Sequence, residues 1–119
     1  MSLAATLVIV LVALLHLWFL ILEMFLWTHP SGRQAFGLTE AFAQQSKVLA
    51  ANQGLYNGFL AAGLAWGLCL ESTEALHVKT FFLACILVAG LYGGLTATRK
   101  VLWVQALPAL VGLMLIHMA

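Results

Sequence analysis

The first apolar run of the chain is the feature that most constrains its fold. Among the 25 residues from 3 to 27, His16 and Glu23 are the only strongly polar side chains. A helix of about 20 apolar residues is long enough to cross the hydrocarbon core of a bilayer. The whole chain is 64% hydrophobic and 8% charged, whereas soluble domains carry about 25% charged residues. We therefore expect lipid, rather than water, to surround most of the folded chain.

A secretory signal peptide would also begin with an apolar run, but three features of this run argue against one. No basic residue precedes it, and it is longer than the usual apolar region of about 7–15 residues. It ends in Glu-Met-Phe-Leu-Trp instead of the small residues of a cleavage site. We expect the run to be retained as a helix.

Three further apolar runs, separated by polar connections, predict an all-α integral membrane four-helix bundle that forms a single domain over residues 1–119. Thr28-His29-Pro30-Ser31-Gly32 is expected to stop the first helix, because Pro and Gly disfavour helix interiors. Thr39 followed by Glu40 is typical of a helix start and predicts a short interfacial helix at about 40–48. The four membrane helices are expected at about residues 3–27, 49–70, 76–96 and 101–118.

The distribution of Lys and Arg predicts the orientation of these helices. Cytoplasmic loops carry an excess of basic residues. Arg33 and Lys47 follow the first helix and Arg99 and Lys100 follow the third, whereas the second connection precedes only Lys79. The sequence thus predicts a multi-pass protein of the plasma (inner) membrane, with the first and third loops in the cytoplasm and both termini outside.

Polar side chains of the predicted helices gather at one depth, in the cytoplasmic half of the membrane. At 1.5 Å of rise per residue, Glu23 lies about 7 Å from the cytoplasmic edge. An ionisable group within a membrane helix costs about 2–3 kcal/mol and needs polar partners. We expect a ligand-binding pocket here, and the alternative is a hydrogen-bonded cluster that only fixes helix packing. The candidate ligand-binding residues are Glu23, Asn52, Gln53, Asn57, Tyr92, Thr96, Arg99 and Gln105.

No metal site is predicted. His29 falls on the cytoplasmic side, His77 and His117 on the outer side, and His16 between them, so the four histidines cannot converge. Cys69 and Cys85 lack the spacing of a zinc site. The sequence identifies neither a catalytic residue nor a cofactor.

Glycines recur at a spacing of four residues. Such pairs let helix backbones approach closely in lipid. They fit either tight packing inside one bundle, which we favour, or the interface of a homo-oligomer. The pairs are Gly54 with Gly58, Gly63 with Gly67, and Gly90 with Gly94.

Several segments together resemble a family of small bacterial and fungal membrane proteins known only as a domain of unknown function. The resemblance covers nearly the whole chain and implies a four-helix membrane fold, but no reaction. Its most specific part is Asn52-Gln-Gly-Leu-Tyr-Asn-Gly-Phe-Leu-Ala61. The other parts are Glu23-Met-Phe-Leu-Trp27, Phe36-Gly37, Ala89-Gly-Leu-Tyr-Gly93 with Thr96, and Gln105 with Pro108-Ala109.

Three functions fit these features, and the net charge of +1 favours none that involves nucleic acid. The first is binding of a small apolar or amphipathic molecule, lipid-, isoprenoid- or quinone-like, near Glu23. The second is proton-coupled export, by analogy with small multidrug transporters that have four helices and a glutamate in the first. The third is an assembly or accessory subunit that uses the glycine pairs.

Overall fold

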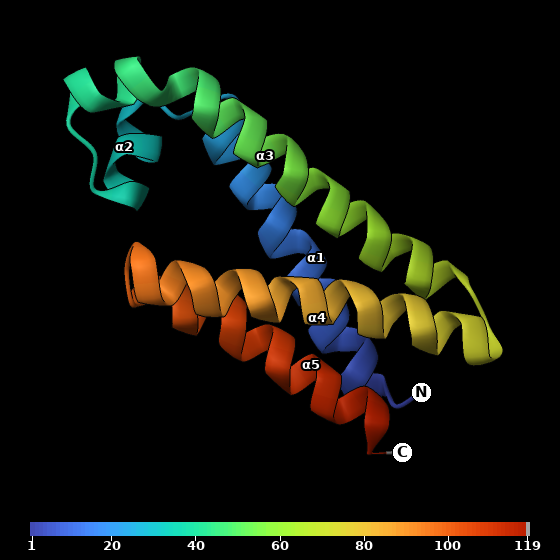
Figure 1. Ribbon diagram of the computed structural model, residues 1–119. Helices are drawn as coiled ribbons and strands as arrows, with labels where there is room; N and C mark the ends of the chain where they lie inside the picture. Colours follow the sequence, from blue (N-terminus) through green and yellow to red (C-terminus); the bar gives the residue numbers. More distant parts are fainter. Residues whose placement is uncertain (119) are drawn as a thin grey trace. The chain divides into compact units, whose positions relative to one another are not determined.

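The computed structural model describes residues 1–118, and within them the chain is all helical, without strands (Figure 1). The all-α class predicted from the sequence is confirmed. The helices are α1 (Leu3–Met24), α2 (Pro30–Phe36), α3 (Glu40–Cys69), α4 (Ser72–Thr96), the π-helical turn η1 (Leu102–Ala106) and α5 (Leu107–His117).

The first connection contains a helix that the sequence analysis missed. α1 ends at Met24, three residues earlier than predicted, and α2 begins at Pro30. Proline was expected only to stop a helix, but at the first helical position its missing N–H costs nothing and its fixed φ suits the helix. α2 ends at Gly37, whose φ of 66° is left-handed and whose N–H donates to the carbonyl of Arg33.

α3 joins two elements that were predicted to be separate. The interfacial helix expected at 40–48 continues without interruption into the helix expected at 49–70. The start was correct, because Thr39 Oγ1 accepts a hydrogen bond from the backbone N–H of Phe42 at 3.2 Å. The two segments form one helix because no Pro or Gly lies between Glu40 and Gln53 to interrupt the hydrogen-bond ladder.

The helix expected at 101–118 begins with a π-helical turn at Leu102–Ala106. The N–H of Leu107 donates to the carbonyl of Leu102, five residues earlier. Pro108 explains this widening, because its ring would clash with the carbonyl four residues before it in a regular α-helix.

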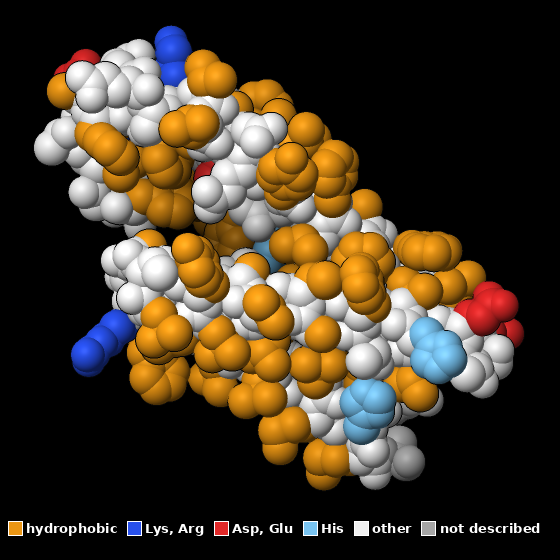
Figure 2. Space-filling view, in the orientation of Figure 1, with side chains coloured by type: hydrophobic (Ala, Val, Ile, Leu, Met, Phe, Trp, Pro, Cys, Tyr) orange, Lys and Arg blue, Asp and Glu red, His pale blue; other side chains and the backbone are white. Residues whose placement is uncertain are grey.

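Two helices, α1 and α4, are long and apolar enough to cross a membrane, and Leu102–His117 is a shorter apolar helical stretch. Large hydrophobic side chains are exposed along α4 and α5, and they cover much of the surface of these helices visible in Figure 2. Examples are Phe81, Val88, Leu91, Leu95, Leu107, Leu110 and Met114.

The chain divides into two compact units, residues 14–61 and residues 1–13 with 62–119. Within each unit, the paired glycines face helices of this same chain. A Cβ on Gly58 would lie 2.6 Å from Leu20 Cδ1, and one on Gly63 would lie 2.3 Å from the Phe82 ring. At these separations a Cβ would force the Leu20 or Phe82 side chain to shift, so glycine lets the helices pack as they do here.

Candidate functional site

A buried carboxyl–amide pair forms the centre of the 14–61 unit. Glu23 lies in the last turn of α1 and is 3% exposed, and Asn57 of α3 is 8% exposed. The Asn57 side-chain amide donates a hydrogen bond through Nδ2 to Glu23 Oε1. The partner of the acid is therefore a neutral amide of another helix and not a cation.

Gly54 allows this pair to form. It precedes Asn57 by three residues and thus faces α1 on the same side of α3. A Cβ at this position would lie 3.0 Å from Glu23 Cβ and 2.7 Å from Met24 Cγ. Gly54 was identified only as a packing glycine, and its distance of three residues from Asn57 was the signal that it borders the site.

A second polar contact joins the connection after α1 to the start of α3. Trp27 Nε1 donates to Ser46 Oγ at 3.0 Å, and the same hydroxyl donates to the carbonyl of Phe42 at 2.7 Å. The Trp27 ring also lies 4.9 Å from the Phe36 ring. These contacts hold α2 and the first turns of α3 beside the end of α1.

The other candidates on α3 lie at the surface. Asn52 and Gln53 are exposed, although they lie within two turns of Asn57. Their amides can each donate and accept hydrogen bonds, so they supply polar groups on the outside of the helix that carries Asn57.

The remaining candidates belong to the unit of residues 1–13 and 62–119. Tyr92 is 71% exposed, and Thr96 is exposed and donates its hydroxyl to the carbonyl of Tyr92 at 2.7 Å. Arg99 is also exposed, whereas Gln105 is half-buried in η1. The structure thus brings together Glu23 and Asn57, and it places most of the other predicted ligands at the surface.

His16 lies in the interior of this structure. It is fully buried in α1, and its ring lies edge-on to Phe19 with 5.1 Å between the centroids. In residues 1–118, no three His, Cys, Asp or Glu side chains gather as a metal ion would require.

A family model described as "Protein of unknown function (DUF1304)" matches residues 10–117, which include both members of the buried pair. The chain belongs to the DUF1304 family. The resemblance to a domain of unknown function is therefore confirmed. This DUF1304 protein is similar to "Uncharacterized protein YpaA" of Lactococcus lactis subsp. lactis (strain IL1403), with 31% identity over 107 residues, 88% of this chain and 89% of that protein. No solved structure matches it.

Proposed function

We propose that this DUF1304 protein is a four-helix integral membrane protein of the plasma (inner) membrane, with both termini outside. The length and composition of α1 and α4 support two of the four crossings. In this proposal, residues 49–69 of α3 and the stretch Leu102–His117 form the other two crossings. The exposed hydrophobic side chains of α4 and α5 support lipid as their surroundings, because large exposed apolar patches are uncommon in soluble monomers.

The proposed orientation is testable with two exposed threonines. Thr73 lies at the start of α4, and Thr98 lies between α4 and η1. In a Cys69→Ser, Cys85→Ser background, Thr73→Cys is expected to react with a membrane-impermeant maleimide in intact spheroplasts. Thr98→Cys is expected to react only after lysis. The reverse pattern would reject the orientation, and equal labelling of both in intact spheroplasts would reject the intervening crossing.

We further propose that the protein binds a small apolar or amphipathic molecule, lipid-, isoprenoid- or quinone-like, at Glu23. The buried Glu23–Asn57 pair carries this proposal. Burial of a carboxyl group in an apolar helix is costly and, in membrane helices, is usually retained for function. A carboxyl–amide pair offers both acceptors and a donor to a hydroxyl or carbonyl headgroup. Asn52 and Gln53, which lie within two turns of Asn57 on α3, are proposed to extend the polar surroundings of the ligand.

Native mass spectrometry with defined probes tests this binding. The purified protein is titrated separately with decylubiquinone, farnesol and monoolein. One probe is expected to bind with a stoichiometry of one, and Glu23→Gln is expected to weaken it by about tenfold or more, since a hydrogen bond to a charged group contributes about 1.5–3 kcal/mol. Glu40→Gln, an exposed acid at the start of α3, is the control. Equal binding by the Glu23→Gln and Glu40→Gln proteins would reject the site.

The buried acid also favours the second candidate, a proton-coupled exporter. The same Glu23→Gln protein separates the two functions when it is reconstituted in liposomes. An exporter would lose proton-driven release of the probe, whereas a binding protein would show no such release even as wild type. The assembly role receives no support from the glycine pairs, because each of them faces this chain's own helices.

A further inference from the structure

A buried lysine lies in the unit of residues 1–13 and 62–119. Lys79 of α4 is 6% exposed. Gly67, near the end of α3, leaves room for the aliphatic part of the Lys79 side chain, because a Cβ at Gly67 would lie 2.8 Å from Lys79 Cγ. Lysine is almost never buried to this degree without a counter-charge. From the sequence alone, Lys79 was interpreted only as a charge that sets topology.

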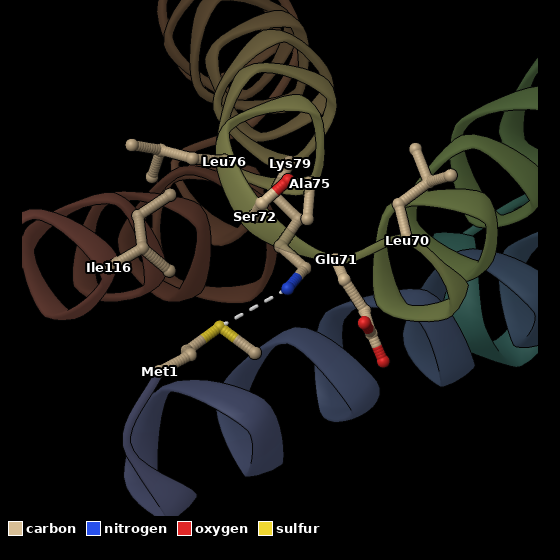
Figure 3. Close-up of a pocket in the computed structure, with 8 residues that line it drawn as sticks. All are labelled: Met1, Leu70, Glu71, Ser72, Ala75, Leu76, Lys79 and Ile116. Atoms are coloured by element: carbon tan, nitrogen blue, oxygen red, sulfur yellow. Dashed lines mark hydrogen bonds between the residues drawn. The ribbon is translucent and has the colours of Figure 1, made fainter.

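Within residues 1–118 no carboxylate is paired with this ammonium group, although Glu71 lines the same cavity. Lys79 Nζ lies 3.4 Å from Met1 Sδ, as Figure 3 shows, and this is the one hydrogen-bond contact that residues 1–118 give it. A thioether is a weak, uncharged acceptor, whereas an ammonium group has three N–H donors. The arrangement thus leaves most of the hydrogen-bonding capacity of Lys79 unused.

Lys79 lines a cavity of about 360 Å³ at the N-terminal end of α4. Leu70, Ala75, Leu76 and Ile116 supply apolar walls, and the polar lining beside Lys79 is the hydroxyl of Ser72 and the carboxyl group of Glu71 (Figure 3). The first N–H groups of a helix need acceptors, and the side chain of Glu71, at the N-cap, makes no capping hydrogen bond. The cavity therefore combines a buried cation and the positive end of a 25-residue helix with apolar walls.

We propose that this cavity binds the phosphate of an anionic phospholipid headgroup, with Lys79 as the counter-charge. The phosphate oxygens accept the free N–H donors of Lys79, and charge-assisted bonds of this kind are stronger than neutral ones. The volume lies within the range of about 300–1,000 Å³ for small-molecule pockets, which suits a headgroup. The apolar walls favour a lipid over free phosphate, because they can contact its glycerol and first acyl carbons.

The probes for this site are phosphatidylglycerol, phosphatidylcholine and inorganic phosphate, each titrated into detergent-exchanged protein and counted by native mass spectrometry. Wild type is expected to retain one phosphatidylglycerol and to bind phosphatidylcholine less tightly, because choline places a second cation near Lys79. Lys79→Met is expected to weaken phosphatidylglycerol binding by about 10- to 100-fold, the range for a charge-assisted hydrogen bond. Lys79→Arg is expected to preserve most of the binding.

Two further variants guard against a folding artefact. Lys47→Met removes an exposed lysine of α3 and is expected to leave phosphatidylglycerol binding unchanged. Ala75→Leu fills the cavity while keeping Lys79, and it is expected to abolish binding with helical content intact. If the Lys79→Met and Ala75→Leu proteins both bound as much phosphatidylglycerol as the wild-type protein, the proposal would be overturned. If inorganic phosphate bound as tightly as phosphatidylglycerol, the site would be one for free phosphate and the assignment to a lipid headgroup would be overturned.

Discussion

Replacing Asn57 by leucine is expected to lower the free energy of unfolding by about 1–3 kcal/mol. The leucine removes the amide that donates to Glu23 Oε1 and leaves a buried carboxyl group without that partner. An unsatisfied buried polar group costs this much because its lost hydration is no longer compensated. Reversible unfolding in mixed micelles, followed by far-UV circular dichroism, measures the change.

Two comparisons separate this effect from a general loss of polarity. Asn52→Leu changes an exposed residue of the same helix and is expected to shift stability by no more than about 0.5 kcal/mol. The double variant Glu23→Met, Asn57→Leu is expected to be more stable than Asn57→Leu alone, because removal of both partners leaves no buried group unsatisfied. Equal stability losses from Asn57→Leu and Asn52→Leu would show that the pair contributes nothing.

Gly90→Ala is expected to destabilise the protein by about 2–3 kcal/mol, near the upper end of overpacking costs. A Cβ at Gly90 would lie 2.5 Å from the backbone nitrogen of Ala106 and 2.8 Å from its Cα. Relief of this clash requires α4 and η1 to move apart, since a backbone cannot rotate away as a side chain can. The same micelle unfolding experiment measures the loss.

Gly112→Ala is the matched control, because its new Cβ would meet only side-chain atoms. The nearest are Leu83 Cδ1 at 3.3 Å and Leu83 Cδ2 at 3.4 Å, which can shift slightly. Alanine also favours a helix interior over glycine by about 1 kcal/mol. Gly112→Ala is therefore expected to be near neutral, and a loss as large as that of Gly90→Ala would contradict the packing described for α4 and η1.

The helices could be predicted because apolar runs and their polar interruptions are properties of the sequence alone. α4 ends at Thr96, where the predicted helix was expected to end, although it begins at Ser72 instead of about residue 76. The start of α3 followed from the capping hydroxyl of Thr39. The missed helix α2 shows the limit of this reasoning. Pro30 can end one helix or begin the next, and the contacts that decide between these roles, such as Trp27 with Ser46, are distant in sequence.

The candidate site could likewise be predicted only in part. Counting residues along a helix gives the depth of a side chain, and Glu23 and Asn57 were placed at compatible depths. Depth does not give the direction in which a side chain points around the helix axis. For this reason, depth alone could not show that Asn52 is exposed while Asn57 is buried. Lys79 was missed for a different reason, because nothing local in the sequence indicates that Gly67 makes room for its stem.

The π-helical turn at Leu102–Ala106 has a consequence for the backbone itself. Pro108 has no N–H, so a carbonyl oxygen in the preceding turn lacks its donor within the helix. In a hydrocarbon environment such an oxygen must find a donor elsewhere, because the solvent offers none. The turn therefore holds a main-chain acceptor that Pro108 deprives of its donor within the helix, and substitution of the side chains in the turn would not remove this acceptor.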